Sequence, residues 1–181
     1  LYGGTIKNVF GGSSINGNIE GNITVNVIDK EGNCPLDITN LYGGSNIADY
    51  NPLDPTVTSP IVNVVHIKET NTTPGYIRAS VFGGSLGHEA EIHSNPQVNI
   101  GYHSSMVGIP ASYHDTITNG VITPHARIAG NVYGGGEEGT VNGNTTVNVF
   151  GGEVGLVAYT WKKATTDHTR PYDSVYHYNP E

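Results

Sequence analysis

The chain has 181 residues, a length that suits one domain, and only 13% of them are charged, against roughly 25% in ordinary soluble domains. Its net charge of −8 and its pI of about 5.4 give no electrostatic footprint for nucleic acid or for an anionic membrane surface. The sequence has no run of 18 apolar residues that could cross a bilayer, and its single cysteine, Cys34, excludes an internal disulfide.

The composition favours strands throughout the chain. Glycine is abundant at 25 residues, while methionine and phenylalanine are scarce. Most apolar residues are Val, Ile and Tyr, which suit a pleated strand, and no window shows an apolar stripe at helical spacing. The chain is therefore expected to be nearly all β.

A four-residue segment recurs from the first residue onward: Val or Leu, then Tyr or Phe, then two glycines. Its six copies, here called aromatic-diglycine segments, lie at residues 1–4, 9–12, 41–44, 81–84, 132–135 and 149–152. Six copies in one chain are not chance and identify an internal repeat.

A second segment, Val-Asn-Val or a close variant, follows most of these copies. It lies at residues 25–27, 62–64, 98–100 and 147–149. A step of about 15 to 20 residues fits one coil of a β-solenoid and is too short for a helical repeat or a propeller blade. The expected fold is a right-handed parallel β-helix with loop insertions. Roughly eight coils at about 4.8 Å each would make it roughly 40 Å long.

The most regular unit is residues 131–152, which read as three short strands joined by two turns. Gly and Asn occupy the turns, where they tolerate positive φ. In the last strand, alternation places Val147 and Val149 on one side and Asn148 on the other. The valine side is expected to face the narrow interior.

Insertions interrupt the period at residues 29–40, 45–60 and 101–130, and prolines mark them as loops because proline cannot donate to a strand ladder. Such insertions often collect on one face and carry binding. The solenoid is expected to cover residues 1–158, with 159–181 a cap or connecting segment. Since the chain opens inside a repeated segment, it is expected to be a piece of a longer polypeptide.

Two stretches resemble repeats of a known family. Asn131-Val132-Tyr133-Gly134-Gly135-Gly136 with the following residues 141–149, and likewise residues 41–52, are similar to repeats in very large secreted adhesin-like β-helix proteins of Bacteroidetes. The resemblance covers residues 1 to about 157 and departs from the pattern at 101–130. It implies export, an extracellular or cell-surface location and a shaft built of repeats. It is specific for the architecture and weak for a biochemical role.

The aromatic position of the repeat is the candidate ligand-binding surface. Neighbouring residues of a strand point to opposite faces, so an inward Val132 implies an outward Tyr133. The expected outward column, which could stack on sugar rings, consists of Tyr2, Phe10, Tyr42, Phe82, Tyr133 and Phe150. The favoured alternative is an aromatic ladder that packs on itself or under an insertion.

Metal and catalytic sites find little support. On a strand Glu89, Glu91 and His93 would share a side, but they match no motif of three or four zinc ligands, and a solvated strand face is favoured. The scattered histidines His103, His114, His125, His168 and His177 are likewise expected at the surface. Acidic residues are few and do not recur at the expected coil spacing, as a paired-carboxylate glycosidase would need. No metal, cofactor or enzymatic activity is therefore expected.

The expected function is that of a structural or adhesive repeat module of a larger bacterial cell-surface or secreted protein. Its insertions would contact a glycan or a surface protein of a host or neighbouring cell. One alternative is a carbohydrate-active β-helix that binds or cleaves a polysaccharide. Another is a filament component that self-associates through stacked repeats. Nucleic acid and membrane insertion are not expected.

Overall fold

The computed structural model describes residues 1–30, 32–67 and 76–155, and within them the chain is all-β apart from one short 3-10 helix, η1 (Ala111–Tyr113). No helix in these ranges is long and apolar enough to cross a membrane. The strands are β1 (Gly4–Phe10), β2 (Thr24–Ile28), β3 (Leu36–Tyr42), β4 (Thr58–His66), β5 (Val81–Phe82), β6 (Glu91–Ile92), β7 (Asn95–Ile100), β8 (Thr116–Thr118), β9 (Val121–Thr123), β10 (Arg127–Ile128), β11 (Val132–Tyr133), β12 (Thr140–Val141), β13 (Thr146–Val149) and β14 (Glu153–Val154).

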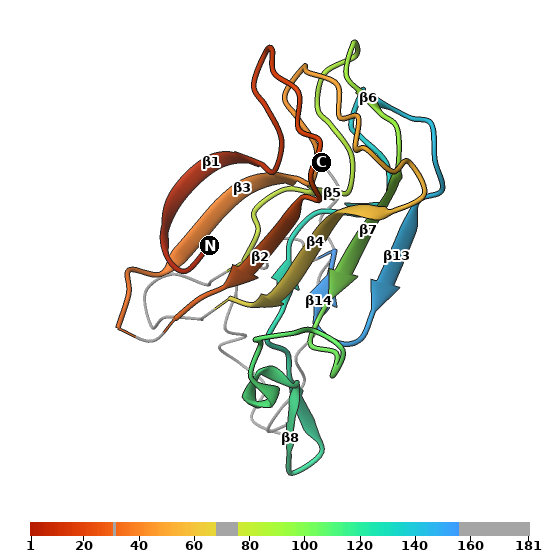
Figure 1. The fold of residues 1–181 in the computed structure, drawn as a ribbon. Coiled ribbons are helices and arrows are strands. Elements are labelled where there is room, and N and C mark those ends of the chain that lie inside the picture. Colours follow the sequence, from red (N-terminus) through yellow and green to blue (C-terminus); the bar gives the residue numbers. More distant parts are fainter. Residues whose placement is uncertain (31, 68–75, 156–181) are drawn as a thin grey trace.

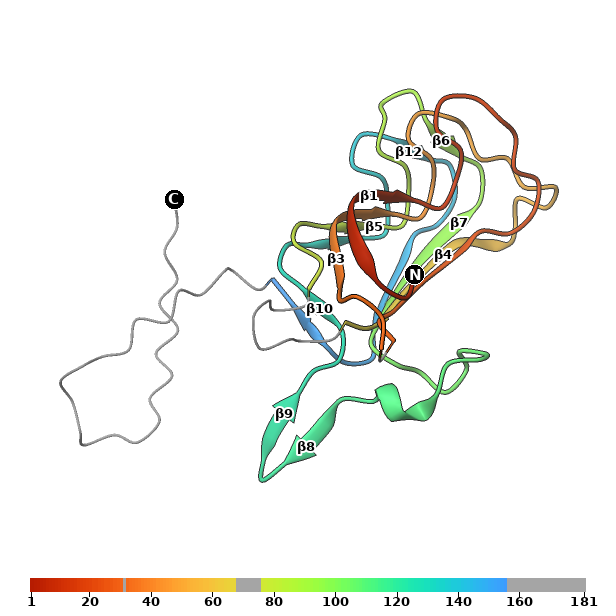
Figure 2. The same cartoon turned by 90° about the vertical axis from the view of Figure 1, so that its left-hand side faces the viewer.

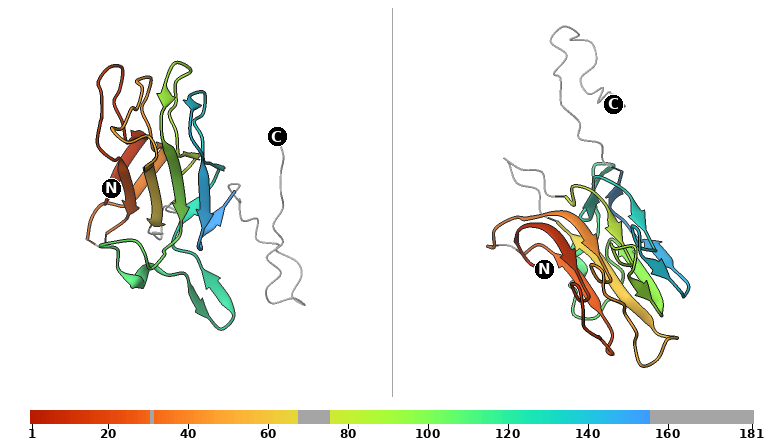
Figure 3. Two further views of the ribbon diagram at one scale, coloured as in Figure 1. Left: turned by 45° about the vertical axis from the view of Figure 1, so that its right-hand side comes forward. Right: turned by 90° about the horizontal axis from the view of Figure 1, so that it is seen from above.

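Two parallel sheets carry the fold (Figure 1). Sheet A has the order β1-β3-β5-β11 and sheet B the order β13-β7-β4-β2. The chain passes through sheet A and then sheet B in each of four successive layers: β1 with β2, β3 with β4, β5 with β7, and β11 with β13. The colours therefore advance from red to blue across the molecule in step with the chain (Figure 3).

Shorter parallel pairings join further segments of successive layers outside these two four-stranded sheets. Strand β6 pairs in parallel with β12, and a bridge from Tyr50 to Ile92 extends this pairing by one layer. At one position of the repeat, five successive segments of the chain pair in parallel, each with the next. Its residues are Ile6, Ile38, Ile77, Ile128 and Val154.

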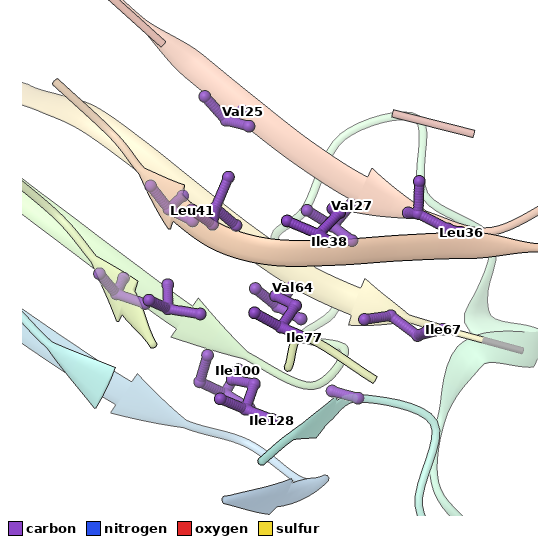
Figure 4. Packing of buried hydrophobic residues seen from close by; sticks show 14 of the residues in the cluster. Val25, Val27, Leu36, Ile38, Leu41, Val64, Ile67, Ile77, Ile100 and Ile128 are labelled. Atoms are coloured by element: carbon purple, nitrogen blue, oxygen red, sulfur yellow. The ribbon is translucent and has the colours of Figure 1, made fainter. Parts of the chain in front are cut away.

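The core lies between the sheets and consists mainly of Val, Leu and Ile (Figure 4). In sheet B, Val62, Val64, Val98 and Ile100 have no exposed surface. Full burial of one such side chain contributes roughly 1.5–3 kcal/mol. Strands supply these residues at every second position, which explains the alternation of valine with asparagine in the sequence.

The expected coil of about 15 to 20 residues is wrong. The asparagines of the Val-Asn-Val segments that meet on neighbouring strands of sheet B are 37, 36 and 49 residues apart. Segments about 16 residues apart lie in different sheets of the same layer instead of on top of one another. The described residues accordingly form four full layers, where roughly eight coils were expected.

The expected insertions begin as loops but end inside strands, because the sheets resume at Leu36, Thr58 and Arg127. Pro60 lies within β4, where the register to β7 shifts between Thr58 and Ile61. A strand tolerates a missing N–H at such an irregularity. The longest insertion contains η1 and the antiparallel hairpin β8–β9, which projects from the stack (Figure 2). The expected cap at 159–181 lies outside the described residues.

Most glycines of the aromatic-diglycine segments serve close approach of backbones, and not the positive φ expected of turn glycines. Only Gly4 and Gly152 of these segments have positive φ, at 108° and 90°. A Cβ on Gly43 would collide with the carbonyl oxygen of Gly83 in the next layer and lie 2.8 Å from Val62 Cγ2. The same collision awaits a Cβ on Gly11 or Gly83. Close stacking of layers therefore requires glycine there.

Candidate functional site

An aromatic column follows sheet A on its outer side. Phe10, Tyr42, Phe82 and Tyr133 stack with ring centroids 5.0, 5.1 and 4.9 Å apart and interplanar angles of 11°, 5° and 10°. Tyr42 and Phe82 are only 1% and 7% exposed, whereas Tyr133 is 45% exposed. Because the inner rings cover each other's faces, the ring faces that remain open to a ligand within this column are those at its two ends.

A hydrogen bond fixes the column from the side. The Tyr42 hydroxyl donates to Glu137 Oε2 from the loop after β11. Burial, and then this carboxylate acceptor, raise the pKa of Tyr42 well above its ordinary value. The phenol therefore stays protonated and bonded at any physiological pH.

Tyr2 and Phe150 do not belong to this column, which corrects the expectation of six stacked aromatic residues. The Tyr2 ring lies 4.0 Å from the Lys30 ammonium, and Phe150 stacks on His103 at 4.4 Å. These two copies lie at the end of sheet B. The Ile28 N–H donates to Leu1 O, and the Phe150 N–H donates to Ile100 O. The aromatic-diglycine segment therefore occurs in two different places: four copies lie at the end of sheet A strands, and the copies at 1–4 and 149–152 lie at the end of sheet B.

An asparagine ladder runs along sheet B. Nδ2 of Asn63 donates to Oδ1 of Asn26 at 2.8 Å, Asn99 to Asn63 at 2.7 Å, and Asn148 to Asn99 at 2.9 Å. Asn63 and Asn99 are 7% and 5% exposed. Each inner amide therefore donates and accepts within the ladder, which satisfies these polar groups where water has little access.

A polar groove lies where the loops after the diglycines gather, at the top of Figure 1. It has a volume of about 520 Å³ and draws on three successive layers. Its lining residues are Ile15, Asn16, Gly17, Asn18, Ile47, Ala48, Asp49, Asn51 and Glu89. We call this the loop groove. Sequence reasoning missed it, although polar residues follow the diglycine at corresponding positions in residues 13–18 and 45–51.

Main-chain hydrogen bonds hold the loops of the groove together. The N–H groups of Asn46 and Ile47 donate to Ser13 O and Ser14 O at 3.0 and 2.9 Å. In the next layer, those of Leu86 and Gly87 donate to Ser45 O and Asn46 O at 3.1 and 2.6 Å. The loops therefore continue the layer stacking beyond the strands, and the groove is preformed.

The chemistry of the loop groove suits a ligand rich in hydroxyl groups. Its side chains are three amides, two carboxylates, the exposed apolar Ile15 and Ile47, and the buried Ala48, and no Lys, Arg or His lines it. Asp49 is held in place because its Oδ1 accepts the Glu91 N–H at 2.8 Å. Amides and carboxylates exchange hydrogen bonds with hydroxyls, whereas the absence of lining cations disfavours an anionic ligand.

Of the three residues considered for a metal, the structure brings Glu91 and His93 together and places Glu89 apart from them. Glu91 Oε2 lies 3.2 Å from His93 Nε2 and accepts a hydrogen bond from Asn142, while Glu89 lines the loop groove. The described ranges contain no group of three or more His, Cys, Asp or Glu side chains arranged to hold a metal ion.

One histidine expected at the surface, His125, instead packs against His66 at the base of the long insertion. His66 and His125 face each other with their Nδ1 atoms 2.9 Å apart, and Tyr113 stacks on His66 at 4.8 Å. Asp115 accepts the backbone N–H groups of His125 and Gly152. A small apolar cluster of Ile28, Val65 and Ile109 completes the contact. The base of the insertion is thus packed, while the hairpin beyond it carries the exposed Ile117 and Ile122.

Comparison of the chain with protein-family models, with curated proteins and with solved structures finds no match to any of them.

Proposed function

We propose that this chain is a β-solenoid module, a right-handed parallel β-helix, within a larger bacterial cell-surface or secreted protein, and that it presents the loop groove to a glycan or protein. The observation that carries the proposal is the construction of the groove: corresponding loops of successive layers bond to one another through their main chains. The extracellular location and the larger parent protein rest on the resemblance to adhesin-like repeat proteins.

The proposed structural role is supported by the aromatic column and the asparagine ladder. The aromatic column and the asparagine ladder each join all four layers, so every layer is tied to its neighbours on two sides. Stacking of identical side chains adds order to parallel strands in register. Such a stack suits a shaft that holds binding loops at a fixed place.

The proposed adhesive role of the loop groove is tested by binding measurements. The whole chain is applied to an array of glycans and extracellular-matrix proteins, together with two matched variants. Asn16→Ala with Asn51→Ala alters the loop groove, and Ile117→Thr with Ile122→Thr alters the projecting hairpin. We expect the groove variant to lose at least tenfold in affinity and the hairpin variant to bind as the parent does. No binding to any ligand, or equal binding by the groove variant, would contradict adhesion through the groove.

Polysaccharide cleavage is the second candidate, because Asp49 and Glu89 line the same groove. Hydrolysis of a glycosidic bond uses two carboxylates on either side of the bond. If the groove cleaves a bound polysaccharide, incubation releases reducing ends, and Asp49→Asn or Glu89→Gln abolishes the release while binding persists. Binding without any release of reducing ends would leave adhesion as the function.

A further inference from the structure

The short parallel pairing around β6 carries three exposed carboxylates. Tyr50 and Ile92, both fully buried, form a parallel bridge. The bridge places the residues before them, Asp49 and Glu91, side by side with outward side chains. Glu89 is exposed in the turn that leads into β6. Asp49 belongs to the second layer and the two glutamates to the third, so each carboxylate has a described layer on both sides.

Among these three carboxylates, only Glu91 has side-chain partners within the described residues. Its Oε2 lies 3.2 Å from His93 Nε2 and accepts a hydrogen bond from Asn142 Nδ2 at 3.0 Å. Asp49 Oδ1 accepts the main-chain N–H of Glu91 at 2.8 Å. In the part of the chain that the structure describes, neither Asp49 nor Glu89 forms an ion pair. The two carboxylates that line the loop groove are therefore the two without a charged partner.

None of the described Lys and Arg side chains lines the loop groove. Arg78 pairs with Asp37 at 2.6 Å. Arg127 lies 3.4 Å from Glu153. The described ranges also hold no group of three or more His, Cys, Asp or Glu side chains arranged to bind a metal ion. A positively charged ligand would supply the counter-charge that the described chain does not bring to the groove.

The rest of the groove lining suits a sugar. The amides of Asn16 and Asn51 line the groove, and they form no side-chain hydrogen bond with other described residues. Ile47 is exposed yet packed against Gly87, where a Cβ would lie 2.4 Å from Ile47 Cγ2. The amides suit hydroxyl groups, and the isoleucine suits the C–H face of a sugar ring. The groove volume of about 520 Å³ lies within the roughly 300–1,000 Å³ of small-ligand sites.

We infer that the loop groove recognises a glycan that carries free amino groups, with a protonated amine held by Asp49 and Glu89 and neighbouring hydroxyls held by the amides. This inference rests on the proposed adhesive function of the groove and names its ligand class. An ammonium group donates charge-assisted hydrogen bonds to carboxylates, which are roughly twice as strong as those between neutral groups. The net charge of −8 attracts the same class of ligand over a longer range.

Three oligosaccharides of one backbone separate recognition of the amine from recognition of the ring. The hexamers of β-1,4-linked glucosamine, N-acetylglucosamine and glucose differ only in the group at C2. Calorimetry measures their binding to the whole chain at a pH at which the amine is protonated. We expect the glucosamine hexamer to bind about tenfold more tightly, or better, than the two neutral hexamers. We also expect this advantage to shrink as the salt concentration rises.

Single charge-removing variants locate the contact. We expect Asp49→Asn or Glu89→Gln to remove the advantage of the glucosamine hexamer and to leave the binding of the two neutral hexamers unchanged. Glu138→Gln is the matched control, because it removes the same charge from an exposed residue that does not line the groove. We expect this control to keep the advantage.

The outcomes separate this inference from the proposed function. If all three hexamers bind equally and Asn16→Ala with Asn51→Ala abolishes their binding, the groove binds glycans and the inferred preference for an amine is overturned. The inference is also overturned if a hexamer of lysine binds as tightly as that of glucosamine, or if Glu138→Gln weakens binding as much as Asp49→Asn does. If none of the hexamers binds, the inference is overturned, and the proposed adhesive function falls with it only when the array of glycans and matrix proteins is also blank.

Discussion

At the scale of single residues, two residue types define the repeat: glycine, which has no side chain, and asparagine, which has an amide side chain. Glycine lets neighbouring backbones approach at Gly11, Gly43 and Gly83, and asparagine fills one line of sheet B with paired amides. The two residue types solve different problems. The first removes a steric obstacle between layers, and the second satisfies polar groups that layer stacking buries.

Substitution of Gly43 by alanine tests the steric role. A methyl group there would collide with Gly83 O, so we expect Gly43→Ala to lower the free energy of unfolding by about 1–3 kcal/mol. Gly135→Ala is the matched control, because nothing lies within 4 Å of a Cβ at that glycine. Urea denaturation compares the two variants. Equal stability of both would show that close approach does not require the glycine.

Substitution of Asn99 by alanine tests the ladder. It leaves Asn63 Oδ1 and Asn148 Nδ2 without their ladder partners, which costs about 1–3 kcal/mol where the groups are buried. Asn148→Ala at the end of the ladder removes one bond at a more exposed position, so we expect a loss of less than about 1 kcal/mol. Denaturation midpoints of the two variants provide the comparison, and the reverse order would argue against the ladder.

The Tyr42 hydroxyl predicts a loss of stability in alkali. Its pKa is raised in the folded state, so the protonated phenol contributes stability that is fully present below the unfolded pKa of about 10. That contribution disappears as the pH rises above this value. We expect the parent chain to lose more stability between pH 9 and pH 11 than Tyr42→Phe does. Parallel curves for the two chains would contradict the assignment.

At the scale of elements, strand type and parallel pairing could be predicted from the sequence, but the sheet to which each copy belongs could not. The segments at 9–12 and 149–152 look alike, yet Phe10 lies in sheet A while Phe150 follows β13. The four residues of the aromatic-diglycine segment specify a strand end with a close approach of backbones, and both the sheet A position and the sheet B position require this. The layer spacing depends on which segments pair, and this depends on the core contacts between sheets. The loop groove was missed for the same reason, since its residues come from three layers.

At the scale of the whole molecule, each layer contacts mainly the layers above and below it. Stability of such a stack is the sum of layer and interface terms, so the terminal layers open most readily. Backbone amides of β4 and β7 are therefore expected to exchange with deuterium more slowly than those of β13, whose Val147 and Val149 are half exposed. Hydrogen exchange read by mass spectrometry measures this gradient. Uniform protection across β4, β7 and β13 would indicate a single cooperative unit.

In the asparagine ladder, the distance between neighbouring amide groups does not depend on the number of residues between them in the sequence. Successive asparagines are separated by 36 to 49 residues, yet their amide groups meet at 2.7–2.9 Å in every case. The longest of these separations contains the projecting hairpin. Evolution can therefore lengthen, shorten or replace the peptide between two rungs and leave the rungs where they are, so that one rigid frame can display many unrelated surfaces.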